Sequence, residues 1–308
     1  MSDAMTAAKA KGREHWTEVK GQKIFLWQKR RTAGPERGTI LFVHGSSMAS
    51  TPTFDLQAPV GPPNSSVMDW FTARGFDTWC FDHRGYGRSY KGPEFLATIA
   101  DGREDLSAVS DYILKTTNCG PVCAYGISSG AIRAATLAES HPERVKRLAL
   151  DAYVYTGAGS PTLEQRRKKL DEWRSATRRK VDAAFLNSIF TRDHPGTGED
   201  QWIPSFIEAV LALDDSIPNG TYIDMCANLP LNDPAKITAP TIIMRGEYDG
   251  IAGFDDLIEF FKKLPNPDKE FAVMPGISHA SFQQKNHMRA YEILLSFFTR
   301  PEPVYKGH

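Results

Sequence analysis

One short segment of the sequence places a serine between glycines, where its hydroxyl could act as a nucleophile. The segment is Gly126-Ile127-Ser128-Ser129-Gly130, which fits the pattern G-x-S-x-G and directly follows the apolar run 122–125. A serine at this place predicts a sharp connection between a strand and a helix. Glycines on both sides let the two backbones pass closely. The turn would expose Ser128 beside unpaired N–H groups of the helix, which favour developing negative charge.

A second glycine-containing turn, His44-Gly45, follows the predicted strand 39–44. A loop at this place can direct a backbone N–H toward the same point as the first turn of the helix after Ser128. We therefore assign an oxyanion-binding site to the backbone N–H groups of Ser46 and Ser129. Taken alone, the His-Gly pair fits an ordinary strand end equally well. The functional interpretation depends on its occurring together with the serine turn.

The elements that must position these residues alternate along the first half of the chain and again near its end. Short β-favouring runs bounded by turn residues predict strands at 23–28, 39–44, 78–82, 122–125, 145–154, 240–245 and 270–274. Helical spacing of apolar residues predicts helices at 105–117, 129–140, 254–264 and 290–299. Strands that alternate with helices imply a mostly parallel sheet covered on both faces.

The region 155–239 interrupts this alternation. It contains helical patterns and prolines without a convincing strand pattern, and it predicts one long helix or two over 163–190 and another at 202–213. Because strands resume at 240, we interpret 155–239 as a helical lid inserted into a core formed by 1–154 and 240–308. The polar start of the chain, 1–15, is expected to be a frayed tail.

Five motifs, taken in order, resemble those of the α/β hydrolases, in particular the lidded esterases and serine-aminopeptidase-like enzymes. They are His44-Gly45, Asp82-His83-Arg84-Gly85-Tyr86-Gly87-Arg88-Ser89, the segment 126–130, Arg245-Gly246-Glu247-Tyr248-Asp249 and Gly276-Ile277-Ser278-His279. The resemblance covers residues 22–299 and implies the α/β-hydrolase fold, a mostly parallel eight-stranded sheet with an inserted helical lid.

The same resemblance implies a catalytic triad formed by Ser128, Asp249 and His279. Asp249 and His279 each follow a predicted strand, so both would lie beside Ser128 at the carboxyl edge of the sheet. His279 would accept the serine proton, and Asp249 would orient the imidazole. Asp151, at the end of the strand 145–154, is the rival acid because some members of this fold place their acid there, and Glu247 is a further alternative.

The surroundings of the site are less clearly marked in the sequence. Substrate contacts are expected from Met48, Phe54, Tyr153 and Trp202, and the long loop 46–66 is expected to wall the acyl pocket. The basic run 165–180 could face an anionic substrate, but a run of this kind is more often a solvated helix face. We therefore expect no preference for anionic substrates.

Composition limits the class of partner. The chain has 308 residues, 41% of them hydrophobic and 24% charged, and its formal net charge of zero gives no basic excess for nucleic-acid binding. No apolar run reaches the ~20 residues that cross a bilayer, and the start has no secretory pattern. We expect a cytoplasmic protein with reduced cysteines and a small-molecule substrate, and without a membrane partner, cofactor or metal; homodimer formation is left open.

These features predict hydrolysis of an ester, thioester, lactone or amide bond in a small or medium organic substrate. Two alternatives stay open. The same fold and triad support carbon–carbon bond hydrolysis, and the same scaffold can serve as a non-catalytic small-molecule receptor. Epoxide hydrolases and haloalkane dehalogenases are disfavoured, because those families use a carboxylate nucleophile where this chain has Ser128.

Overall fold

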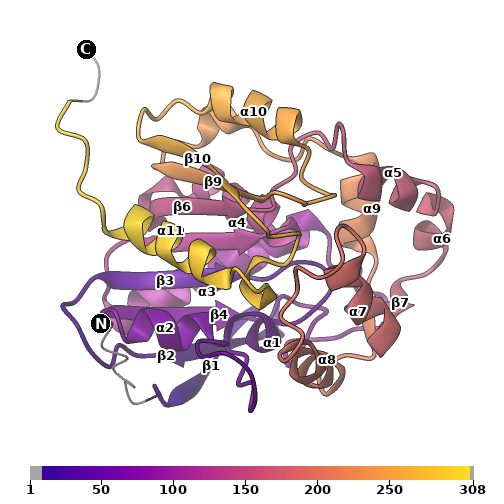
Figure 1. Cartoon of the computed structure of the whole chain (residues 1–308), viewed down its shortest axis with the longest axis horizontal. Helices are drawn as coiled ribbons and strands as arrows, with labels where there is room; N and C mark the ends of the chain where they lie inside the picture. Colours follow the sequence, from indigo (N-terminus) through magenta and orange to yellow (C-terminus); the bar gives the residue numbers. More distant parts are fainter. Residues whose placement is uncertain (1–8, 306–308) are drawn as a thin grey trace.

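The chain folds around one sheet that contains every predicted strand and one more. The structure is a computed structural model that describes residues 9–305. Within them, eight strands join in the order β1-β2-β4-β3-β5-β6-β9-β10, and β3 to β6, β9 and β10 run parallel (Figure 1). The strands are β1 (Gly12–Val19), β2 (Gln22–Lys29), β3 (Gly38–Val43), β4 (Phe76–Phe81), β5 (Val122–Ile127), β6 (Val145–Asp151), β9 (Thr241–Gly246) and β10 (Lys269–Met274).

The added strand is β1, and it corrects the expectation of a frayed tail over 1–15. Residues 1–8 lie outside the described part, but Gly12–Val19 pairs antiparallel with β2 along its whole length. His15 joins this strand to its neighbours, because its ring nitrogens lie 3.0 Å from Gln28 Oε1 and 3.1 Å from Tyr112 Oη. The strand lies at the edge of the sheet and is mostly polar, so its sequence lacks the apolar pattern of an inner strand.

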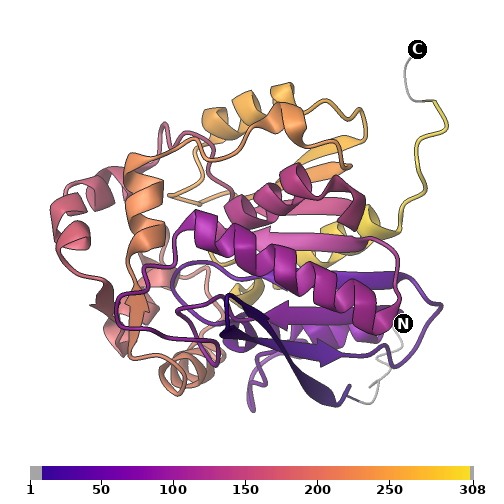
Figure 2. The ribbon, with the colours of Figure 1, turned by 180° about the vertical axis from the view of Figure 1, so that it is seen from behind.

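Helices cover both faces of the sheet. One face carries α3 (Ile99–Thr117), α4 (Ser129–Ser140) and α10 (Phe254–Lys263), and the other carries α2 (Val67–Thr72) and α11 (His287–Thr299) (Figures 1 and 2). Shorter turns are α1 (Ser50–Phe54) and the 3₁₀ segments Pro142–Arg144, Pro234–Lys236 and Ser281–Gln283.

Inner strands bury both of their faces. In β3, Leu41 and Val43 pack on the side of α3 and α4, whereas Ile40 and Phe42 pack on the side of α2 and α11. Side chains that alternate across a strand must all be apolar when helices cover both faces. This explains the continuous hydrophobic runs in the sequence, and it leaves the carboxyl ends of the strands as the place for polar residues.

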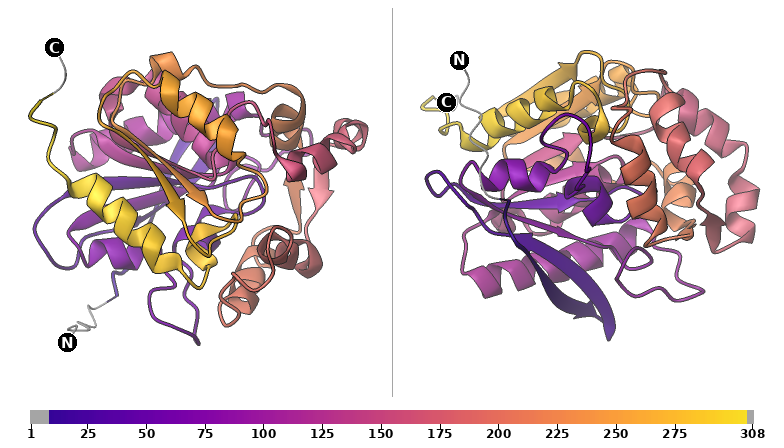
Figure 3. Two further views of the ribbon diagram at one scale, coloured as in Figure 1. Left: turned by 45° about the horizontal axis from the view of Figure 1, so that its top comes forward. Right: turned by 60° about the horizontal axis from the view of Figure 1, so that its bottom comes forward.

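The segment 155–239 lies between β6 and β9 and forms a layer at one end of the strands (Figures 1 and 3). The expectation of one or two helices over 163–190 is wrong: the chain breaks there into α5, α6, β7 and α7, because β7 pairs antiparallel with β8. The elements are α5 (Pro161–Arg167), α6 (Leu170–Ser175), β7 (Arg178–Lys180), α7 (Ala183–Thr191), α8 (Ile203–Leu211), β8 (Ser216–Pro218) and α9 (Gly220–Ala227).

Candidate active site

Ser128 occupies a strained turn between β5 and α4. Its backbone has φ 57° and ψ −126°, and a positive φ of this kind is costly for a residue with a side chain. Its N–H donates to the Asp151 carbonyl at 2.8 Å, which holds the turn against β6. A Cβ at Gly126 would lie 2.3 Å from the Gly130 carbonyl oxygen, and one at Gly130 would lie 2.3 Å from the Val43 oxygen. The tight turn that the glycines predict is therefore present.

The loop after β3 lies against this turn. A Cβ at Gly45 would lie 3.5 Å from Ser128 Cβ. His44 Nε2 accepts the His83 N–H at 3.0 Å, so Nδ1 carries the ring proton and donates to the Gly45 carbonyl at 2.7 Å. Burial, aided by the Arg133 charge, lowers the pKa of His44 to about 3, which keeps the ring neutral.

Two peptide groups beside Ser128 have their carbonyls occupied. The Gly45 carbonyl accepts from His44, and the Ser128 carbonyl accepts the Ala131 N–H at 2.9 Å. In a trans peptide the N–H points opposite to the C=O, so the N–H groups of Ser46 and Ser129 point away from these partners. Ser46 lines the same pocket as Ser128, and the Ser128 side chain does not cap the helix that starts at Ser129.

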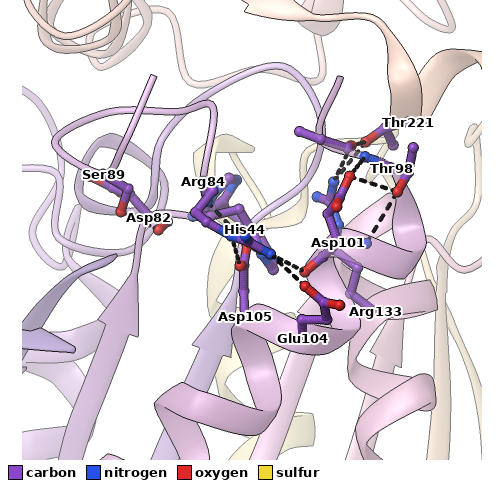
Figure 4. Close-up of polar contacts among 12 residues, drawn as sticks. His44, Asp82, Arg84, Ser89, Thr98, Asp101, Glu104, Asp105, Arg133 and Thr221 are labelled. Carbon is purple, nitrogen blue, oxygen red and sulfur yellow. Dashed lines mark hydrogen bonds and ion pairs between the residues drawn. The ribbon is translucent and has the colours of Figure 1, made fainter. Parts of the chain in front are cut away.

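The turn behind His44 is fixed by a buried ion pair between Arg84 and Asp105 (Figure 4). Asp105 also accepts the Arg84 N–H at 3.0 Å and lies 3.2 Å from His83 Nδ1. Burial raises the pKa of Asp105 to about 6, although the Arg84 charge opposes that rise. Asp82, in the same motif, accepts from Ser50. Through these contacts the motif 82–89 holds the loop that carries His44 in place.

Asp249 and His279 meet at the carboxyl edge of the sheet. His279 Nδ1 lies 3.0 Å from Asp249 Oδ2 and 3.1 Å from Oδ1, and both residues are buried. Asp249 Oδ1 also accepts the N–H groups of Ile251 at 2.8 Å and Ala252 at 3.0 Å. Burial alone would raise the pKa of Asp249, but His279 and these two N–H groups lower it to about 2. The carboxylate is therefore ionised at any pH near neutral.

Ser128 and His279 line one pocket. Within residues 9–305, no hydrogen bond joins the Ser128 hydroxyl to the His279 ring, a contact that often tightens only with substrate present. The lining residues are Gly45, Ser46, Ser47, Met48, Thr53, Ile127, Ser128, Arg166, Ile189, Arg192, His279, Ala280 and Gln283. The structure thus brings the serine, the histidine with its acid, and the loop that carries Ser46 together.

The rival acids lie elsewhere. Asp151 is fully buried at the end of β6, where it accepts the Tyr125 hydroxyl at 2.6 Å, and burial raises its pKa to about 7. Glu247 accepts the Gly276 N–H at 2.8 Å. The hydrogen bonds of the His279 ring go to Asp249 and to neither of these two carboxyl groups.

The side chains of the four expected substrate contacts lie in different places. Met48 lines the pocket, but Phe54 packs in the core against Phe42 and Tyr125. Tyr153 packs on Phe260, and Trp202, which belongs to the segment 155–239, packs on His287 of α11. All three side chains are buried by protein, as large aromatic side chains in cores generally are. The loop 46–66 contributes Ser46, Ser47, Met48 and Thr53 to the pocket wall.

The basic run 165–180 does not form one solvated face. Arg167, Lys168, Lys169, Arg174 and Lys180 are exposed, as expected. Arg166, however, lines the pocket, and Arg179 is half-buried with its Nη2 donating to the Ser46 carbonyl at 2.9 Å. Arg192, outside the run, also lines the pocket. Pairing of β7 with β8 brings Arg179 inward, whereas Arg166 lies in α5 and Arg192 directly follows α7.

The fold and this arrangement of residues define an α/β hydrolase. Residues 64–286 match the Hydrolase_4 family, described as serine aminopeptidase, S33, and the chain therefore belongs to that family. Among residues 9–305, no helix combines the length and apolarity that crossing a membrane requires.

Similar proteins agree with this fold. The Escherichia coli (strain K12) protein YnbC is 23% identical over 231 residues, which are 72% of this chain and 37% of that protein, so the chain spans little more than a third of its relative. The monoacylglycerol lipase of Paleococcus ferrophilus has a TM-score of 0.66 at 18% identity, covering 89% of this chain and 98% of that one. E-2-(acetamidomethylene)succinate hydrolase has a TM-score of 0.67 at 18% identity, covering 94% and 100%.

Proposed function

We propose that this protein is a serine hydrolase that cleaves a carboxylic ester bond, or a related thioester, lactone or amide, in a small or medium organic substrate. The observation that carries this proposal is the pocket in which Ser128 lies with His279, while Asp249 holds the far side of the His279 ring. An unassisted serine hydroxyl is a poor nucleophile, and a base oriented by a third group makes it reactive.

The reaction would proceed in two halves. Ser128 Oγ attacks the ester carbonyl carbon while its proton passes to His279 Nε2 and the carbonyl π electrons move onto oxygen. Collapse of this intermediate breaks the bond to the alkoxide, which takes the proton from His279. Water then repeats the sequence on the acyl-enzyme and releases the acid. Asp249, ionised because its pKa is about 2, would stabilise the charged imidazole in both halves.

The N–H groups of Ser46 and Ser129 would bind the oxyanion of each intermediate. Support comes from the hydrogen bonds to the Gly45 and Ser128 carbonyls. Because each carbonyl is held in place, the N–H group on the opposite side of the same peptide has a fixed direction beside Ser128. Donors fixed before the reaction stabilise the developing charge without reorganisation. In this scheme His44 is a positioning residue, because it acts on the substrate through the Gly45–Ser46 peptide.

Replacing His44 with alanine should lower kcat by about 10²-fold, the cost of losing one oxyanion donor, with a much smaller change in KM. The reason is that the Gly45–Ser46 peptide loses the bond that fixes its direction. Steady-state kinetics on a folded variant, checked by its melting temperature, measures the two constants separately.

The variant His44→Asn provides the matched control, because its side-chain NH₂ can take the place of Nδ1 and donate to the Gly45 carbonyl. It should recover part of the lost kcat. Equal losses in both variants, or a loss confined to KM, would show that His44 does not orient the oxyanion site.

The segment 155–239 would act as the lid of this pocket. It supplies Arg166, Ile189 and Arg192 to the lining, so it encloses the site from the side opposite the sheet. Structures with similar folds include a lipase, an esterase and other hydrolases by their names, which supports hydrolysis without defining this chain's substrate.

A panel of ethyl, phenyl and thioethyl esters of C2 to C10 acids tests the proposal, with released acid measured by titration. We expect multiple turnovers of at least one short or medium ester. Turnover of a β-diketone with no ester cleaved would favour the carbon–carbon hydrolase. Tight binding of the esters without turnover would favour the receptor.

A further inference from the structure

Two arginines belong to the pocket that contains Ser128 and His279. Arg166 comes from α5 and Arg192 from the residue after α7, so the segment 155–239 supplies both. The remainder of the lining includes the apolar side chains of Met48, Ile127 and Ile189. Hydrolysis of an uncharged ester by the scheme above uses neither guanidinium, so their presence calls for another role.

The guanidinium of Arg166 differs from that of Arg192 in what it contacts. Within residues 9–305, no carboxylate forms an ion pair with its guanidinium, which lies 4.2 Å above the Tyr222 ring. Arg192 differs, since its Nε donates to Asp193 at 2.8 Å. A guanidinium withdrawn from solvent without a counter-ion is unfavourable unless a ligand supplies the charge.

A third guanidinium adds to the positive potential. Arg179 lies 3.5 Å from the Tyr222 ring and donates to the carbonyls of Ser46 at 2.9 Å and Pro218 at 2.6 Å, which are neutral acceptors. Burial alone would raise the pKa of Tyr222, but Arg166 and Arg179 lower it to about 7, with help from a 3.5 Å contact to Ser47 and from Arg192. The tyrosine thus reports a local excess of positive charge.

The N–H groups of a guanidinium lie in its plane, where they can bind a carboxylate through two parallel hydrogen bonds while one face of the group contacts an aromatic ring. The apolar lining would contact the carbon chain that joins this carboxylate to the reacting ester. We propose that the substrate is an ester carrying a free carboxylate, and that Arg166, with Arg192 beside it, binds that carboxylate. The inference rests on the proposed function for its ester, but the anion site itself does not require turnover.

The test compares two pairs of esters that differ in one charge. Monoethyl glutarate and ethyl pentanoate place the charge on the acyl side, and 4-acetoxybenzoate and 4-methylphenyl acetate place it on the leaving group. At pH 6, below the pKa of Tyr222, the phenol stays protonated and does not compete with the substrate. We expect a higher kcat/KM for the charged member of at least one pair.

The variant Arg166→Met should lower the charged-to-neutral ratio of kcat/KM for that pair by about 10- to 100-fold, the range for a lost hydrogen bond to a charged group. Arg166→Lys keeps the charge without the planar guanidinium, so its charged-to-neutral ratio should lie between those of the wild type and Arg166→Met. Arg174→Met is the matched control, because Arg174 belongs to the same basic run but is exposed and lies outside the pocket lining. Its ratio should equal that of the wild type.

Calorimetric binding of glutarate to Ser128→Ala, with and without Arg166→Met, separates the two proposals. Esters cleaved with no charge preference in either pair would overturn the carboxylate site and leave the hydrolase intact. Glutarate binding that depends on Arg166, with no ester cleaved, would overturn the hydrolase and leave the carboxylate site intact. Failure of both turnover and glutarate binding would overturn both.

Discussion

Replacing Ser128 with alanine should reduce kcat by on the order of 10⁶-fold, as loss of the nucleophile does in other serine hydrolases. The hydroxyl is the atom that would form the acyl-enzyme, and no other side chain takes its place on the turn between β5 and α4 within the described residues. The measurement is kcat on the best ester of the panel, with the melting temperature as the check on folding.

The control for this variant is Ser140→Ala, at the other end of the same helix, where the hydroxyl bonds to the Thr136 carbonyl. It should keep wild-type kcat. A Ser128→Ala protein that retained a tenth of the wild-type rate would exclude Ser128 as the nucleophile, whatever its position on the turn.

Asp249→Asn should cost about 10⁴-fold in kcat, as replacement of the orienting carboxylate does in other triads. The Ile251 and Ala252 N–H groups would hold the amide oxygen, leaving its NH₂ toward His279 Nδ1. That arrangement forces Nδ1 to accept a hydrogen bond, so Nε2 carries the proton and cannot accept one from Ser128. Steady-state rates at neutral pH measure the loss.

Asp151→Asn is the matched comparison, because Asp151 is also a buried carboxyl group at the end of a neighbouring strand. Its pKa of about 7 means that the group is largely protonated below neutral pH, and an amide can still accept the Tyr125 hydroxyl. We expect less than a tenfold change, a small effect beside that of Asp249. A larger loss of kcat for Asp151→Asn than for Asp249→Asn would show that Asp151, at the end of β6, is the acid of the triad.

The sequence predicts the centre of the site better than its walls. Ser128, Asp249 and His279 follow strands whose apolar runs are unmistakable, and parallel strands bring their carboxyl ends to one edge of the sheet. Glycine at 126 and 130 is required by backbone contacts near 2.3 Å, so the turn is encoded in residue type as well as in pattern. These positions depend on the topology and not on side-chain packing.

The walls depend on tertiary contacts that no local pattern contains. Phe54, Tyr153 and Trp202 are large aromatic residues, but an aromatic side chain packs equally well in a core or in a pocket, and these three pack in cores. The run 165–180 has the composition of a solvated helix. Pairing of β7 with β8 overrides that local preference and brings Arg179 inward.

Other differences concern the extent of helices and strands, and their causes are local. Helix α3 begins at Ile99, six residues before its predicted start at 105, because Thr98 and Asp101 form a reciprocal cap that satisfies its first N–H groups. The strand β1 was missed because an edge strand can be polar on most of its length.

The central claim is that Ser128 is activated by His279, and reaction with a fluorophosphonate probe measures this activation directly. We predict one equivalent of probe per chain, attached to Ser128 as located by mass spectrometry of the digested protein. His279→Ala should abolish labelling, whereas His194→Ala, a histidine outside the pocket lining, should label as fast as wild type. A folded wild-type protein that is not labelled, or is labelled at another residue, would contradict the account.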